Sequence, residues 1–306
     1  MPDTNFHQLR IFHNVAQLGS FTKAARELNI SQPAVSIQVK ELERSLNTVL
    51  VNRVRRGVFL TDSGEVVYGY TKRIFSLADE MRLAVQDLEG LQAGKLTIGS
   101  SSTPGEYILP LAMGIFRERY PKIDISLAIS NTDTVVQQIL SHELDLGMAG
   151  ADVDIQGLSS FPYVEDEVVV VASPTHALSR DRRWVSLQEI ASQPLIMREV
   201  GSATRNAASD FFKAHNMEVN IAMELGSNEA VKRAAAAGLG LGLLSKFSVG
   251  PDVVAGFLSV LRVRGWKCER PLIVFYRDDG HISTVQQAFL RLLQVERPLP
   301  PVPLQF

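Results

Sequence analysis

The chain has 306 residues, which suggests two or three domains at roughly 100 to 200 residues per domain. Hydrophobic residues (45%) and charged residues (21%) occur at the levels of a globular protein in water. The formal net charge of −2 excludes a general attraction to nucleic acid, so any such binding needs a local patch.

The single cysteine, Cys268, excludes an intramolecular disulfide and argues against a cysteine-based metal site, so we expect no metal cofactor. No basic-then-apolar signal pattern opens the sequence, and no apolar run is long enough to span a bilayer. We therefore expect a cytoplasmic protein without membrane contacts.

The opening segment predicts two short helices, each with one apolar stripe. The stripes are Leu9, Phe12, Val15 and Ala16 in the first helix, and Phe21, Ala24, Ala25 and Leu28 in the second. Ser20 is placed as the N-cap of the second helix. Helices this short are not stable alone, so both must pack on a neighbour.

A third helix supplies that neighbour. It is predicted to begin at Ser31, with Pro33 tolerated in the first turn, where N–H groups lack intrahelical partners. A buried stripe follows at helical spacing: Val35, Val39, Leu42 and Leu46. The residues that then face outward are Gln32, Pro33, Ser36, Ile37 and Lys40.

The second and third helices, joined by the short turn "LNIS", predict a helix-turn-helix whose last helix can enter the DNA major groove. There Gln32 can read adenine, Ser36 either base type, and the apolar Ile37 can meet a thymine methyl. Lys40 suits a phosphate contact. The alternative is a small three-helix packing unit whose polar face is merely solvated.

The next stretch, "LVNRVRRGVFLT", alternates like a hairpin with Gly57 at the turn. Its basic residues are Arg53, Arg55 and Arg56. A basic hairpin after a helix-turn-helix is a wing that can reach phosphates or the minor groove. A solvated edge hairpin protected by charge is the alternative.

Residues 67–91 show apolar residues at alternating spacings of three and four, which is typical of a helix that pairs as in a coiled coil. The seam consists of Val67, Tyr70, Ile74, Leu77, Met81, Ala84, Leu88 and Leu91. A single helix packed on its own domain is the alternative.

From Gly94 onward, short apolar strands alternate with helices, which predicts parallel α/β sheets in two lobes. Ligands in such sheets lie beyond the carboxyl ends of the strands. Two segments that lead from a strand or loop into a predicted helix are rich in hydroxyl side chains. The first segment holds Ser100, Ser101, Ser102 and Thr103, and the second holds Ser202, Thr204 and Arg205.

Hydroxyls and free N–H groups at a helix start favour an anion, and Arg205 would add a bidentate donor. The sequence therefore suggests a small anion held between two facing helix starts. The alternative is that these serines and threonines are simply N-caps.

The run "GSFTKAARELNISQPAVSIQVKELE" and the later "FLTDSG" resemble the winged helix-turn-helix of LysR-type transcriptional regulators. The resemblance implies a mixed fold. An all-α winged helix-turn-helix DNA-binding domain would occupy residues 1–66, a dimerising linker helix 67–92, and a two-lobed α/β effector domain, like periplasmic binding proteins, 93–306. Lobe I would comprise about 93–163 and 268–306, and lobe II about 164–267.

By the same resemblance, Gln32, Pro33 and Ser36 match base-contacting positions and Arg53 the wing arginine, while Ile37 stands where many members have arginine. The implied partners are operator DNA, a small co-inducer, further copies of the chain as a dimer or dimer of dimers (a homotetramer), and RNA polymerase.

In the last two-thirds, "GSATR" and "LGSNEAVKRAAAAGLGLGLLS" are similar to the branch with regulators of Calvin-cycle operons and sulfur assimilation. The resemblance places Asn228 with the serines, threonines and Arg205 in an effector cleft. It also implies an anionic effector: a sugar phosphate, a nucleotide or a small sulfur oxyanion.

An enzyme is disfavoured, because the six histidines are scattered and no nucleophile elbow or phosphate-binding glycine loop is present. A solute-binding protein for transport would share the two-lobed fold, but the winged N-terminus argues against it.

Overall fold

The computed structural model describes residues 5–54, 57–87, 94–150, 155–180, 184–278 and 282–300. They form an N-terminal unit, residues up to 86 together with 141–143, and a C-terminal unit with the rest of the chain. Each unit has buried hydrophobic clusters of its own.

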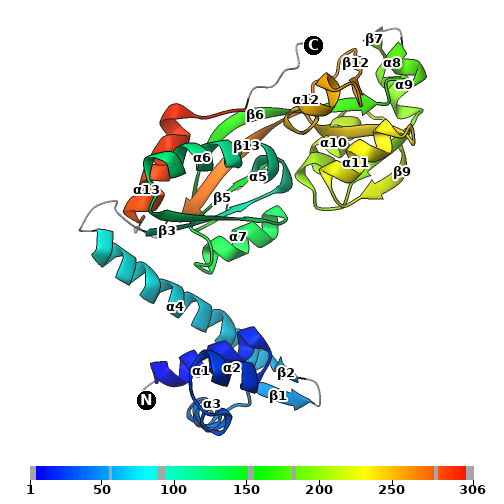
Figure 1. The fold of residues 1–306 in the computed structure, drawn as a ribbon. Helices are drawn as coiled ribbons and strands as arrows, with labels where there is room; N and C mark the ends of the chain where they lie inside the picture. Colours follow the sequence, from blue (N-terminus) through cyan, green and yellow to red (C-terminus); the bar gives the residue numbers. More distant parts are fainter. Residues whose placement is uncertain are drawn as a thin grey trace. The chain divides into compact units, whose positions relative to one another are not determined.

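The N-terminal unit is the predicted helix-turn-helix followed by a hairpin and a long helix (Figure 1). Its caps are confirmed: Ser20 Oγ accepts from the N–H of Lys23, and Ser31 Oγ from that of Ala34, both at 3.3 Å. The apolar stripes meet in one cluster around the fully buried Phe12. The exception is Leu46, which was expected in the buried stripe of the third helix but is 40% exposed, because it lies in the last position of that helix. The elements are α1 (Phe6–Leu18), α2 (Phe21–Glu27), α3 (Gln32–Leu46), β1 (Val51–Val54), β2 (Gly57–Leu60) and α4 (Asp62–Asp87).

Helix α4 begins five residues before the predicted start at residue 67, because Asp62 and Glu65 provide acidic residues for its first turn. The predicted seam divides between two faces. Val67 and Ile74 pack against the cluster of their own unit. Tyr70, Leu77 and Met81 remain exposed, whereas Leu88 and Leu91 lie outside the described residues and the side chain of Ala84 is not described.

The C-terminal unit is built on one continuous sheet with helices on both faces (Figure 1). The main strand order is β4-β3-β5-β13-β6-β10-β8-β9, with β11 beside β6. These strands are β3 (Gly94–Ser100), β4 (Ile123–Ile129), β5 (Leu146–Ala149), β6 (Leu158–Ala172), β8 (Pro194–Arg198), β9 (Asn220–Leu225), β10 (Leu241–Ser245), β11 (Ser259–Val260) and β13 (Glu269–Arg277).

The helices alternate with these strands as predicted, and the last α-helix continues into a π-helical turn. They are α5 (Ser102–Tyr107), α6 (Leu109–Arg119), α7 (Thr132–Leu140), α8 (Ala177–Arg180), α9 (Leu187–Ala191), α10 (Ala203–Ala214), α11 (Asn228–Ala236), α12 (Lys246–Val254), α13 (Thr284–Arg291) and the π-helix η1 (Leu292–Glu296). Two short strands, β7 (Trp184–Val185) and β12 (Arg262–Val263), pair apart from the main sheet.

The sequence predicted parallel sheets, but the observed sheet contains both parallel and antiparallel strand pairs. Strand β3 is parallel to β4 and β5, and β8 is parallel to β9 and β10, but β6 and β13 are antiparallel to each other and to their outer neighbours. These two long strands run from one lobe into the other (Figure 1). Two antiparallel crossings therefore join two mostly parallel lobes.

Each lobe has its own core. In the lobe built on β3, β4 and β5, lobe I, Phe116 and Phe289 meet edge to face at 5.2 Å between ring centroids. In the lobe built on β8, β9 and β10, lobe II, Phe212 packs with the apolar strands β8 and β10. Across the residues that the structure describes, no helix combines the length and apolar character needed to cross a membrane.

Candidate nucleic-acid interface and interlobe cavity

The outward face of α3 presents the side chains expected to read bases. Gln32, Pro33, Ile37 and Lys40 are exposed, and 56% of Ile37 is accessible, so its apolar side chain is available to a thymine methyl group. Gln32 Nε2 donates to Ser36 Oγ at 2.8 Å. This bond orients the amide and leaves its oxygen and second N–H for a base edge, the pair that suits adenine.

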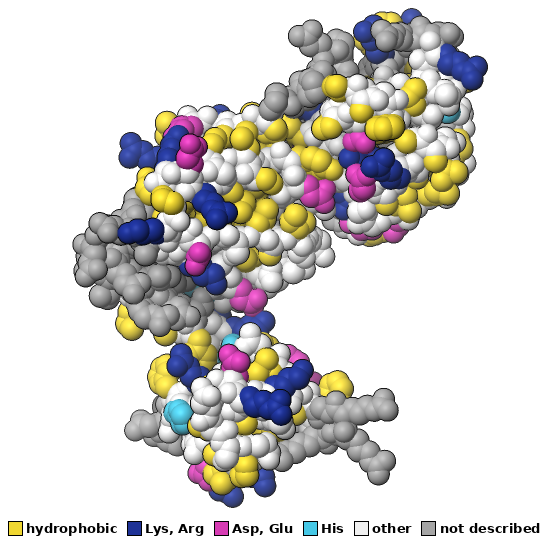
Figure 2. Space-filling model, viewed as in Figure 1, with side chains coloured by type: hydrophobic (Ala, Val, Ile, Leu, Met, Phe, Trp, Pro, Cys, Tyr) yellow, Lys and Arg dark blue, Asp and Glu magenta, His cyan; other side chains and the backbone are white. Residues whose placement is uncertain are grey.

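The wing follows α3 directly. Glu43 Oε1 accepts the N–H groups of Leu50 and Val51 at 2.8 and 3.2 Å, which ties the end of α3 to β1. Arg53 pairs with Val58 in the antiparallel hairpin, although the Arg53 side chain is not described, and Arg55 and Arg56 lie outside the described residues. On the face seen in Figure 2, the Lys and Arg side chains of this unit lie among neutral side chains and a few acidic ones.

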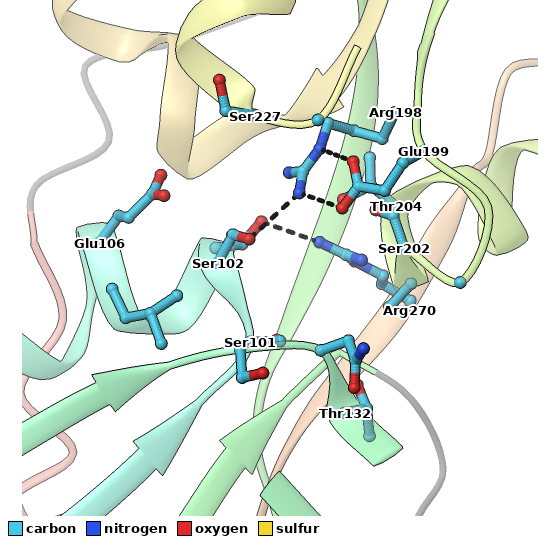
Figure 3. Close-up of a pocket in the computed structure, with 17 residues that line it drawn as sticks. Ser101, Ser102, Glu106, Thr132, Arg198, Glu199, Ser202, Thr204, Ser227 and Arg270 are labelled. Atoms are coloured by element: carbon cyan, nitrogen blue, oxygen red, sulfur yellow. Dashed lines mark hydrogen bonds and ion pairs between the residues drawn. The ribbon is translucent and has the colours of Figure 1, made fainter. Parts of the chain in front are cut away.

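Between the lobes of the C-terminal unit lies a cavity of about 380 Å³, the size of a small metabolite site (Figure 3). Much of its wall is made of helix starts, whose N–H groups favour an anion. They contribute Ser101, Ser102 and Thr103 from α5, Asn131 and Thr132 from α7, Ser202, Ala203 and Thr204 from α10, and Ser227 from α11. The two predicted hydroxyl segments thus face one cavity.

The hydroxyls of this wall are not simply N-caps. Ser101 and Ser202 occupy the N-cap positions of α5 and α10, but neither side chain makes a capping hydrogen bond. By contrast, Ser227 Oγ accepts the N–H of Ala230 at 3.1 Å and is a true cap. The capping alternative therefore does not hold for Ser101 and Ser202.

Two buried arginines reach this cavity, and neither was predicted from the sequence. Arg198 ends β8 and is 4% exposed, and Arg270 lies in β13 and is 6% exposed. Arg198 Nη2 donates to Ser102 Oγ at 3.1 Å, and Arg270 Nη2 donates to Thr103 Oγ1 at 3.2 Å (Figure 3). The signal that could have found them is a lone cation in or at the end of an apolar strand.

Each arginine is held by a carboxylate. Glu199 binds the Arg198 guanidinium at 2.7 and 2.8 Å, and this pairing holds the pKa of Glu199 below its ordinary value. Asp166, fully buried, accepts from Arg270 at 2.9 and 3.0 Å and from Ser245 Oγ at 2.7 Å. Burial raises the pKa of Asp166, and Arg270 opposes that shift.

The remaining predicted cleft residues lie elsewhere. Ser100 is fully buried and donates to the carbonyl of Met148 at 2.9 Å, and Asn228 is fully buried behind the cavity wall. Arg205 does not line the cavity: its Nη1 donates to the carbonyl of Arg198 and pairs with Glu224. The bidentate donor expected of Arg205 is thus replaced by Arg198 and Arg270, because the Glu224 carboxylate on β9 draws the Arg205 guanidinium away.

The arrangement defines a protein with a DNA-reading head and a small-molecule domain. Residues 6–65 match the family described as "Bacterial regulatory helix-turn-helix protein, lysR family", and residues 89–297 match "LysR substrate binding domain". The chain is a DNA-binding transcriptional regulator. It belongs to the LysR family, as its motifs predicted.

Its relatives confirm the expected branch. The chain is 36% identical over 293 residues to the HTH-type transcriptional activator CmpR of Synechocystis, covering 96% of each chain. It is 34% identical over 285 residues to the RuBisCO operon transcriptional regulator of Allochromatium vinosum, covering 93% of this chain and 94% of that one. Both are named as regulators, which agrees with the expectation that the protein is not an enzyme.

Solved structures share the fold. The CcmR regulatory domain of Synechocystis in complex with 2-PG is 28% identical, with a TM-score of 0.62 over 67% of this chain and 97% of that one. Full-length CbnR in complex with its target DNA is 20% identical, with a TM-score of 0.74 over 96% of this chain and all of that one. The predicted fold, with a helix-turn-helix head and a two-lobed α/β domain, is confirmed.

Proposed function

We propose that this regulator binds operator DNA through α3 and the wing, and that a small anion held in the interlobe cavity controls that binding. The observation that carries the proposal is the cavity wall. Two buried guanidinium groups line a space of about 380 Å³, together with the hydroxyls of Ser101 and Ser202, which make no capping hydrogen bond. The 2-PG bound by the related CcmR domain supports a small anionic effector.

The mechanism we propose has three links. The anion favours one closure of the lobes, closure changes how effector domains pack in the oligomer, and the packing moves paired DNA-binding heads. An effector can do this only through different affinities for the two arrangements. We assign pairing of the heads to the exposed apolar residues Tyr70, Leu77 and Met81 of α4, and we place the protein in the cytoplasm with its DNA, with RNA polymerase as a further partner.

The anion site is tested with Ser202→Ala. Because the Ser202 hydroxyl makes no capping bond, we expect unchanged stability without ligand. We expect weaker anion binding, since a hydrogen bond to a charged group contributes about 1.5–3 kcal/mol. The measurement is the thermal shift with 2-PG, phosphate, sulfate and sugar bisphosphates, where ligand at 100 times its Kd adds about 2.7 kcal/mol.

Arg205→Ala is the matched control and should keep the wild-type shift, since Arg205 stands outside the cavity wall. A shift lost in Arg205→Ala and retained in Ser202→Ala would contradict the proposed site. No shift of the wild-type protein with any anion would contradict an anionic effector of this kind.

The DNA-reading face is tested by comparing Gln32→Ala with Lys40→Ala. Loss of the Gln32 amide should cost about 1–3 kcal/mol on the specific site and little on scrambled DNA. Loss of Lys40 should weaken both alike and reduce the salt dependence by about one phosphate contact. Equilibrium binding to the DNA upstream of its own gene, at several salt concentrations, measures both. Equal losses on the two DNAs for Gln32→Ala would show that Gln32 does not read a base.

A further inference from the structure

One short helix of lobe I, α5, makes a row of polar contacts with lobe II. Ser102 and Glu106, one turn apart on α5, accept from Arg198 Nη2 and Asn228 Nδ2 of lobe II, both at 3.1 Å. Tyr107, the next residue of α5, lies under the ammonium group of Lys232 at 5.8 Å from the ring centroid. Since Asn228 and Lys232 are also one turn apart, on α11, the two helices face each other across the lobe boundary.

Asn228 is the central member of this set. It is fully buried and does not line the cavity, yet both ends of its amide are used. Its oxygen accepts from Arg198 Nη1, and its nitrogen donates to Glu106. A neutral amide therefore connects a cation of the cavity wall with a carboxylate of the opposite lobe.

Arg198 is the point where ligand and lobe contacts meet. Its guanidinium lines the cavity while it is bonded to Ser102, Glu199 and Asn228. These bonds use four of the five N–H donors that a guanidinium holds in a fixed plane. An anion can therefore accept the remaining N–H of Nη1, the nitrogen that also donates to Asn228, or displace one of the present acceptors. Any rotation of the plane then moves Nη1, and with it the contact between Asn228 and Glu106.

We propose that Asn228 is a positioning residue that couples occupancy of the cavity to closure of the lobes. It orients Arg198 toward the anion and passes a change at Arg198 to Glu106. The bridge Arg198–Asn228–Glu106 gives the two lobe arrangements different affinities for the anion, which is the condition for an allosteric response. The inference rests on the proposed anionic effector and gives that site its link to the opposite lobe.

The test uses Glu106, because this side chain is exposed at the cavity rim and can be changed without opening the core. Glu106→Gln keeps a side-chain oxygen that can accept from Asn228, and Glu106→Ala removes it. We expect Glu106→Gln to behave like the wild type. We expect Glu106→Ala to bind 2-PG with a Kd within about tenfold, the scale of one hydrogen bond, but to lose the change that saturating 2-PG makes in the DNA footprint.

A ligand-free measurement keeps this inference separate from the proposed effector. In the absence of 2-PG, amide hydrogen exchange over α5 and the start of α11 should quicken by about fivefold to tenfold in Glu106→Ala and stay unchanged in Glu106→Gln. If the wild-type protein binds no anion, the proposed effector fails, and the exchange data still decide whether the bridge holds the lobes. A wild-type footprint response and wild-type exchange in Glu106→Ala would overturn the coupling role.

Discussion

Replacing Gly64 by alanine is expected to destabilise the N-terminal unit by about 1–3 kcal/mol, the usual cost of overpacking. A Cβ at this position would lie 2.1 Å from the carbonyl oxygen of Leu50 and 3.2 Å from Leu60 Cβ. The Leu50 backbone cannot easily yield, because its N–H is bonded to Glu43 and its carbonyl oxygen accepts from the N–H of Thr61. The strain therefore falls on the junction between α3, the wing and α4.

The same helix offers a control of opposite sign. Gly69 lies five residues further along α4, and a Cβ there meets no atom within 4 Å. Gly69→Ala should stabilise the unit by about 0.5–1 kcal/mol through helix propensity alone. Urea unfolding of the full-length protein, together with its affinity for DNA, measures both. Gly64→Ala with unchanged stability would show that the wing junction can relax, contrary to the packing described above.

The N-terminal unit could be predicted from the sequence because its signals are local. The caps Ser20 and Ser31 lie next to the helices that they begin, and the apolar stripes repeat within a few residues. The limit appears in α4. Spacing alone could not separate Val67 and Ile74, which pack on their own unit, from Tyr70 and Leu77, which remain exposed, because one helix carries both faces.

The cavity shows the same division between local and long-range information. Its hydroxyls were predictable, since Ser101 and Ser202 directly precede helices. Its arginines were not, because Arg198 and Arg270 come together only through the antiparallel crossing of β6 and β13 between the lobes. Arg205 was misplaced for a related reason: its partner, Glu224, lies on β9, and no spacing within the α10 segment reveals it.

Truncating Arg270 is expected to have the largest effect on the C-terminal unit. Its partner Asp166 is fully buried, and Arg270→Ala would leave that carboxylate uncompensated. Breaking a buried pair in this way costs about 3–5 kcal/mol. The control lies in the same strand region: Lys267 and Glu269 are 3.5 Å apart with 78% and 48% of their side chains exposed, so Lys267→Ala should cost no more than about 1 kcal/mol.

A double variant separates the structural role of Arg270 from its role in the cavity. Asp166→Asn with Arg270→Met removes both charges, while residue 166 keeps an oxygen that can accept from Ser245 Oγ. Most of the stability lost in Arg270→Ala should therefore return, because replacing both partners of a buried pair leaves no uncompensated charge. Anion binding should not return, because the guanidinium beside Thr103 is still missing. Thermal melts with and without 2-PG measure both quantities on one sample. If the double variant regained the full 2-PG shift, Arg270 would serve the fold alone, and Arg198 would remain as the cation of the anion site.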